Sequence, residues 1–154
     1  MAKTLDEVMT IFPSTDRTKW KQHENGLGWV YETAIVGKTA YVAGIVFGNA
    51  RVFGDAWVFG DAQVSGNAQV FGNARVSGDA RVSGNAQVSG NAQVFGNARV
   101  SGNARVFGDA RCSAMLRCSA MLMCSEMLGC PAMLRCPATL KFGGDHDQRS
   151  NGCR

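Results

Sequence analysis

A six-residue repeat runs without interruption through the middle of the chain and constrains the fold more than any other feature. From Val46 to Arg111 the sequence consists of eleven copies of V-[FS]-G-[ND]-A-[RQW]. Valine and alanine alternate with Phe or Ser and with Arg, Gln or Trp, as in a half-buried β-strand. Each Gly-Asn or Gly-Asp pair is a turn signal, because these residues tolerate positive φ. Every repeat therefore predicts a short strand and a sharp turn.

Two architectures could use such turns. In an antiparallel meander, alanine would lie opposite Phe or Ser of the next strand, and both faces would mix apolar with polar residues. If three six-residue repeats instead close an 18-residue coil, valine stacks on valine and alanine on alanine. Each buried valine then contributes about 1.5–3 kcal/mol. The repeat thus predicts an all-β, single-stranded parallel β-helix with three six-residue faces per coil.

Read from its alanine, the unit A-x-V-x-G-[ND] resembles the repeats of the hexapeptide-repeat family. The resemblance covers residues 28–111 and implies a left-handed parallel β-helix. The glycine lies two places after the valine, whereas many enzymes of the family have it one place after. The array is therefore more similar to the regular arrays of uncharacterised bacterial and phage members than to those enzymes.

The segment before the repeats is expected to cap the first coil. Thr4 and Glu7 have capping-box spacing ahead of the apolar stripe in TLDEVMTIF, which predicts a short helix. A cap is needed because the first coil would otherwise expose an apolar interior and unpaired backbone groups. We expect residues 1–27 to form this cap, with Trp20 and Trp29 as lids.

Degenerate repeats precede the regular array and extend the expected β-helix to residues 28–111. They begin at Val30 and Val36, and Val42 begins a shortened unit, VAGI, that lacks two residues before Val46. The β-helix is therefore expected to begin at these irregular units.

After Arg111 the repeat keeps its period of six but changes almost every letter, to CSAMLR CSAMLM CSEMLG CPAMLR CPATLK. Codons for these units can be chosen so that the neighbouring frame reads VFGDA, VFGNA or VSGDA. We therefore hypothesise a frameshift, with one base lost near the Arg111 codon. Leucine would overfill the alanine corner, Ala-Met replaces the Gly-Asn turn, and proline removes ladder donors. Residues 112–154 are expected to form an irregular, Cys/Met/Leu-rich tail, a poor β-helix or disordered.

The competing interpretation of the tail is a functional thiol ladder. All six cysteines of the chain lie in residues 112–154. Those from Cys112 to Cys136 fall on the inward register of valine, and Cys112 and Cys130 would stack one coil apart. Their six-residue spacing lacks the CxxC pattern of structural zinc sites. We predict no metal and no cofactor.

Candidate catalytic residues are few. The family resemblance implies acyltransferases that use a histidine between subunits, and related carbonic anhydrases that hold a metal with three histidines. This chain has two histidines: His23 precedes the repeats and His146 lies in the tail, so neither is expected on the helix wall. Asp55, Asp61, Asp79 and Asp109 share the turn position with Asn and are explained as turn residues. We predict no catalytic residue, although enzymatic activity stays open.

Charge and hydropathy narrow the expected partners. The net charge of +4 comes from interspersed acids and bases, which argues against nucleic acid binding. The longest apolar run is far shorter than the ~20 residues that span a bilayer. Acidic residues interrupt the apolar N-terminus, unlike a secretory signal. We expect a cytoplasmic protein with no membrane partner.

The outward residues contain one irregularity. With 18 residues per coil, Phe53, Phe71 and Phe107 line up on one face, interrupted by Ser89. Exposed aromatic stripes can mark contacts. The alternative is drift between Phe and Ser codons in a recently duplicated array.

Three functional hypotheses follow. The first is a non-catalytic structural or interaction β-helix that self-associates, as a homotrimer or end to end. The alternative is a CoA-dependent acyltransferase whose active site is lost or is encoded beyond the frame break. The third is a degraded gene product without present function.

The frame hypothesis is tested by sequencing the gene through the Arg111 codon to the stop and by an intact mass of the expressed protein. We expect the neighbouring frame to encode further A-x-V-x-G-[ND] units. A nucleotide sequence that cannot encode such repeats in that frame would refute the hypothesis and establish the cysteine-rich units as part of the protein.

Overall fold

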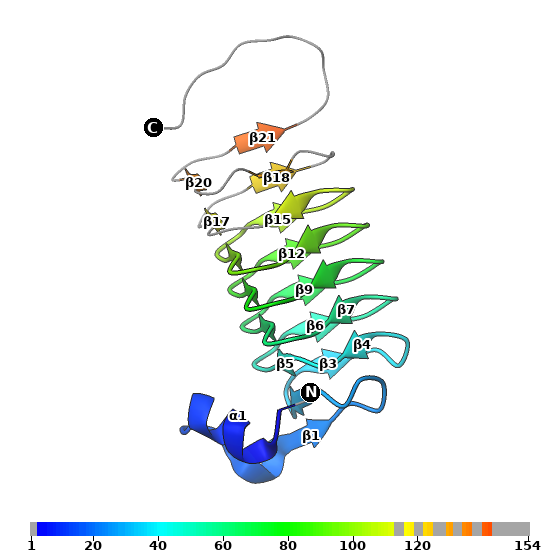
Figure 1. Cartoon of the computed structure of the whole chain (residues 1–154), viewed down its shortest axis with the longest axis vertical. Coiled ribbons are helices and arrows are strands. Elements are labelled where there is room, and N and C mark those ends of the chain that lie inside the picture. Colours follow the sequence, from blue (N-terminus) through cyan, green and yellow to red (C-terminus); the bar gives the residue numbers. More distant parts are fainter. Residues whose placement is uncertain are drawn as a thin grey trace.

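The protein folds into an elongated stack of parallel β-coils with one short helix at the N-terminal end (Figure 1). The computed structural model describes residues 3–112 and, further along, the backbone of five short strands at 116–118, 122–124, 129–130, 134–136 and 140–142. The predicted all-β parallel solenoid with a short N-terminal helix is confirmed.

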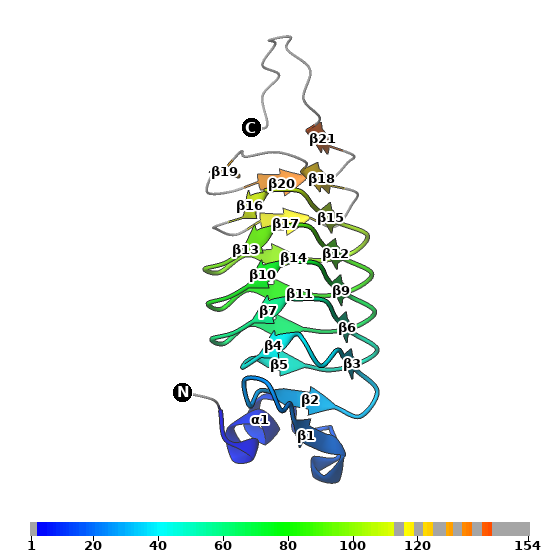
Figure 2. The ribbon, with the colours of Figure 1, turned by 90° about the vertical axis from the view of Figure 1, so that its right-hand side faces the viewer.

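Three sheets form the walls of the solenoid, and Figure 2 shows them as three columns of strands. The first sheet contains β1 (Trp20–Gln22), β2 (Trp29–Tyr31), β5 (Ile45–Val46), β8 (Gln63–Val64), β11 (Arg81–Val82), β14 (Arg99–Val100), β17 (Leu116–Cys118) and β20 (Leu134–Cys136). The second contains β3 (Ile35–Val36), β6 (Arg51–Val52), β9 (Gln69–Val70), β12 (Gln87–Val88), β15 (Arg105–Val106), β18 (Leu122–Cys124) and β21 (Leu140–Phe142). The third contains β4 (Tyr41–Val42), β7 (Trp57–Val58), β10 (Arg75–Val76), β13 (Gln93–Val94), β16 (Arg111–Cys112) and β19 (Gly129–Cys130).

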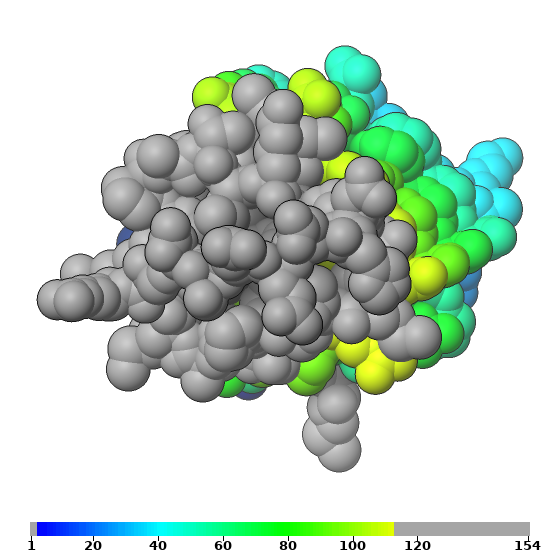
Figure 3. Space-filling model, turned by 90° about the horizontal axis from the view of Figure 1, so that it is seen from above, coloured from blue at the N-terminus to red at the C-terminus, as the bar shows by residue number. Residues whose placement is uncertain are grey.

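Successive coils stack in register. Val82 pairs with Val64 on one side and with Val100 on the other, an offset of 18 residues each way. The backbone N–H of Ser83 donates to the carbonyl of Val100 at 2.8 Å, so hydrogen bonds run from coil to coil. Viewed down the long axis, the outer residues of described coils lie behind one another (Figure 3). Parallel pairing excludes the antiparallel meander.

The interior of the regular array contains only the valine and the alanine of the repeat. The valine and alanine of every regular repeat are 0% exposed, and no polar side chain is buried among the described residues. Because side chains alternate in a strand, the residues between them face outward. The core is therefore one continuous column, and the identity of the outward residues has little influence on it.

The first coil is shorter than the others. Val30 pairs with Val46, an offset two residues smaller than the regular one, as the shortened VAGI unit requires. Where the regular turn is missing, Ala43 and Gly44 both donate their N–H groups to the carbonyl of Val58, at 2.8 and 3.1 Å. The deletion is thus absorbed at a single corner without loss of register.

A glycine with left-handed backbone geometry occupies the turn of every regular repeat. Gly84 has φ of 69°, in the left-handed region. A Cβ atom there would lie only 2.8 Å from the backbone nitrogen of Gly102 in the next coil. The following Asn85 donates its side-chain amide to Asn103 at 3.1 Å and accepts from Asn67 at 3.1 Å, which forms an amide ladder along the corner.

We expect Gly84→Ala to lower the free energy of unfolding by about 1–3 kcal/mol, because the left-handed backbone and the close approach both penalise a methyl group. Ser83→Ala is the matched control, since Ser83 is half-buried and faces outward. Urea titration followed by circular dichroism measures both. Equal losses in the two variants would show that the turn does not require glycine.

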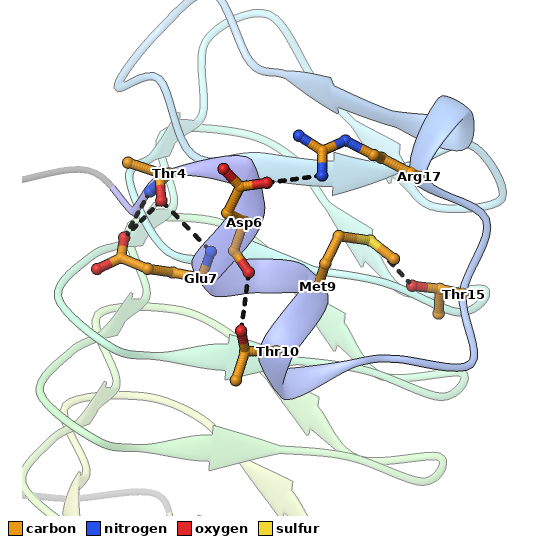
Figure 4. Close-up of polar contacts among 7 residues, drawn as sticks. All are labelled: Thr4, Asp6, Glu7, Met9, Thr10, Thr15 and Arg17. Atoms are coloured by element: carbon orange, nitrogen blue, oxygen red, sulfur yellow. Dashed lines mark hydrogen bonds and ion pairs between the residues drawn. The ribbon is translucent and has the colours of Figure 1, made fainter.

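The N-terminal cap is a helix and an aromatic cluster. The helix α1 (Leu5–Ile11) begins at Thr4, whose side chain accepts from the backbone N–H of Glu7 at 3.3 Å while Glu7 binds the Thr4 N–H at 2.6 Å. Figure 4 shows this predicted capping box. A 3-10 turn η1 (Arg17–Lys19) follows, and Arg17 pairs with Asp6 at 2.6 Å.

Trp20 seals the end of the solenoid. It is 5% exposed and packs with Val8 and Ile45, with ring contacts at 5.8 Å to Phe12 and 6.4 Å to Phe47. The predicted helix is therefore held on the first coil by apolar contacts. None of the helices in the described residues is long and apolar enough to span a membrane.

Trp29 and Lys3 fasten the chain in front of the helix. The indole N–H of Trp29 donates to the carbonyl of Lys3 at 2.6 Å, and the Lys3 ammonium pairs with Asp61 at 2.5 Å. Trp29 is half-buried, so it acts as an anchor, whereas Trp20 is the lid. Two separate coils thereby hold the start of the chain.

A β-hairpin that the sequence analysis did not anticipate covers the edge of the first sheet. β1 pairs antiparallel with β2, so that Lys21 lies opposite Val30. Its turn contains Gly26 with φ of 107° and Leu27 with φ of 59°. β1 supplies backbone hydrogen-bond partners to β2, whose free side would otherwise be the open edge of the first sheet.

The capping box should make the cap sensitive to acid. Hydrogen bonds from the backbone and the hydroxyl of Thr4 hold the pKa of Glu7 below its usual 4.5. Because the pKa is lowered in the folded state, the stabilisation is present above that usual value and is lost as the pH falls below it. The indole N–H of Trp29 donates to the carbonyl of Lys3, which is next to Thr4 in the chain. We therefore expect the Trp29 indole signal in ¹H–¹⁵N spectra to shift on acidification.

Glu7→Gln is the control for this titration. The variant keeps a side chain of the same shape but cannot titrate, so its Trp29 signal should be displaced at neutral pH and insensitive to acid. A signal that titrates identically in both proteins would show that Glu7 does not set the acid response.

The strands of the C-terminal segment continue the three sheets. Val100 pairs with Cys118, Val106 with Cys124, and Cys112 with Cys130. The cysteines from Cys112 to Cys136 therefore share the valine register, as predicted from their spacing. The remaining residues of the segment lie outside those that the structure describes, and the frame hypothesis stays a prediction.

Candidate interaction surface

The predicted phenylalanine stripe lies on the second sheet. Val52, Val70, Val88 and Val106 pair in sequence, which puts the residues that follow them in one outward column. That column contains Phe53, Phe71, Ser89 and Phe107.

The two rings of the stripe nearest the N-terminal cap, those of Phe53 and Phe71, are in contact. Phe53 and Phe71 stack with centroids 5.2 Å apart and planes 7° apart, and Phe53 is 40% exposed. Two parallel rings cover each other's faces and present their edges outward. Ser89 separates this pair from Phe107 by one coil, so the stripe is a stacked pair and a single ring.

A second aromatic group on the third sheet was missed by the sequence analysis. Trp57, which is 44% exposed, lies 4.8 Å from Tyr41 and 6.4 Å from Phe59 between ring centroids. The Arg75 guanidinium lies 5.8 Å from the Trp57 ring centroid in a cation–π contact. One signal was available: Trp57 is the single aromatic at a position where all other regular repeats have Arg or Gln.

The two groups lie on either side of the same corner. Phe53 is the last residue before the turn at Gly54 and Asp55, and Trp57 begins the next strand. We call the five residues of these groups the aromatic surface: Tyr41, Phe53, Trp57, Phe59 and Phe71. It occupies the lower coils, close to the cap, and it contains the most exposed aromatic side chains of the described solenoid.

Among the described residues, His23 and the four turn aspartates, for which no catalytic role was predicted, lie at separate places. His23 lies in the hairpin between β1 and β2, with its Nδ1 atom 3.1 Å from the carbonyl of Asn25. His146 lies outside the described residues. The four aspartates are exposed at turns, where Asp61 pairs with Lys3 and Asp109 accepts from Asn91 at 3.0 Å.

Other candidate sites are limited within the part of the chain that the structure describes. No group of three or more His, Cys, Asp and Glu residues could hold a metal ion there. Cys112 is buried in the valine column. A shallow polar groove on the second sheet is lined by Thr33, Ile35, Asn49, Arg51, Asn67 and Gln69.

Comparison with known families agrees with this fold. A family model described as YdcK Beta solenoid repeat matches residues 68–84, 74–90, 92–106 and 98–113. No curated protein and no solved structure matched the chain. The matched segments lie between residues 68 and 113, almost entirely within the regular array. The fold and the match together show a β-solenoid repeat fold, which is consistent with a structural repeat protein.

Proposed function

We propose that this chain is a non-catalytic structural or interaction protein that self-associates through the aromatic surface. The observation that carries the proposal is the exposure of Phe53 and Trp57, 40% and 44%, on a solenoid whose remaining walls are mostly polar. Aromatic residues are enriched where protein surfaces meet, because each buries a large apolar area. A wall that bears several of them is most stable when covered.

The proposal includes the family and the hand of the coil. The six-residue unit A-x-V-x-G-[ND] supports membership of the hexapeptide-repeat family, and with it a left-handed coil. In such a rod the walls are flat and the coils are evenly spaced. Two copies can therefore lie side by side over several coils.

The position of the aromatic surface favours lateral contact. Its residues lie on the second and third sheets around one corner, whereas the N-terminal end is covered by the helix and by Trp20. A homotrimer would bring three such corners together at a common axis. End-to-end growth at the N-terminal face would require the cap to move first.

Sedimentation velocity over a range of concentrations tests the proposal. We expect wild type to form trimers and the triple variant Phe53→Ser, Phe71→Ser, Trp57→Gln to be monomeric. Serine and glutamine occupy the same positions in other repeats, so the coil should be retained, as circular dichroism can verify.

Phe95→Ser is the matched control, because it removes a phenylalanine from the third sheet outside the aromatic surface. It should sediment like wild type. A wild-type protein that is monomeric at every concentration, or a triple variant that still forms trimers, would refute self-association through this surface.

A further inference from the structure

The first sheet bears a column of arginines on consecutive coils. Arg81 pairs with Arg99 in register, Arg99 with Arg117, and Arg117 with Arg135. In the other two sheets, glutamine, tryptophan or another residue interrupts the arginines at the same position. The first sheet is thus the wall on which positive charge is repeated from coil to coil.

The two arginines of this column whose side chains are described have no ion-pair partner. Arg81 and Arg99 are exposed, and the ion pairs within residues 3–112 are made by Lys3, Arg17 and Lys19. Asp79, at the turn before β11, is the nearest acidic residue in sequence and forms no ion pair either. Like charges directly opposite each other on neighbouring strands are destabilising.

The wall around Arg81 and Arg99 is polar. The outward residues that follow Val82 and Val100 are Ser83 and Ser101, and Ser65 lies one coil nearer the cap. The phenylalanine of this sheet, Phe47, contacts Phe12 and Trp20 of the cap. The adjoining corner has the amide ladder that includes Asn85 and Asn103. Hydroxyl and amide groups therefore flank the arginines along the long axis.

We propose that this wall binds a linear acidic polysaccharide laid along the solenoid axis. Strands in a sheet are about 4.8 Å apart, so the guanidinium groups recur at roughly the length of one sugar unit. Carboxylates in register would convert the repulsion within the column into attraction, and guanidinium groups bind carboxylates with two parallel hydrogen bonds. Serine and asparagine can bind the sugar hydroxyls.

The absence of aromatic residues beside the described arginines favours a polysaccharide over single-stranded nucleic acid. Proteins that bind single strands combine positive charge with aromatic side chains on which bases stack. Next to Arg81 and Arg99 the outward residues are serines, and the aromatic surface lies on the other two sheets. This polyanion wall is therefore separate from the proposed self-association surface, and either proposal can fail without the other.

Binding of the full chain to polygalacturonate, measured by calorimetry at low and at physiological salt, tests the proposal. We expect wild type to bind and affinity to fall with salt. The variant Arg81→Gln, Arg99→Gln should bind about tenfold more weakly, since each exposed charge contact contributes modestly. Gln63 and Gln87 occupy the same position of their repeats, so the fold should be kept.

The variant Arg51→Gln, Arg105→Gln is the control, because it removes the same charge from non-adjacent positions of the second sheet. It should bind like wild type. Equal weakening of polygalacturonate binding in both variants would overturn the proposal, because net charge alone would then explain the affinity. An absence of wild-type binding would also overturn it. Tighter binding of oligothymidylate through Arg81 and Arg99 would overturn it in favour of nucleic acid.

Discussion

The structure depends on the stacking of valine on valine and alanine on alanine along one narrow interior column. Each regular repeat buries its valine and alanine completely, and the coil-to-coil hydrogen bonds follow from the register that burial enforces. A shift of one residue along any strand would turn the valines to solvent. This is why the interior of the regular array is invariant while the outward positions vary between Phe and Ser or between Arg and Gln. The core determines the shape, and the walls are free to differ.

Much of the fold follows from this periodicity and could be predicted from the sequence. The repeat defines three faces, the coil length and the outward column that joins Phe53 to Phe71. The capping box was also readable, because Thr4 and Glu7 have a local spacing with a known geometry. These features share one property: each is encoded within a few residues or within a repeat that makes distant positions equivalent.

The features that were missed lack that property. The hairpin of β1 with β2 rests on a three-residue strand and on a turn with Leu27 at positive φ, neither of which has a strong local signal. The contact of Tyr41 with Trp57 depends on the shortened first coil. Tyr41 falls opposite Trp57 because the coil lacks two residues at the corner of Ala43 and Gly44. The VAGI unit marks that corner, but Tyr41 lies in a degenerate unit before it, so the equivalence of positions in the regular repeat does not extend to Tyr41.

The separation of interior and walls has a functional consequence. Because the three sheets share a core made of identical residues, a substitution on one wall changes neither the register nor the core beneath the other two. The first sheet can therefore become cationic and the corner between the second and third aromatic, each without cost to the other. Coupling between such surfaces needs an element with two arrangements, and a close-packed column of valine and alanine offers none. Binding on one wall should leave affinity on another unchanged, so a solenoid of this kind suits a scaffold whose contacts act independently.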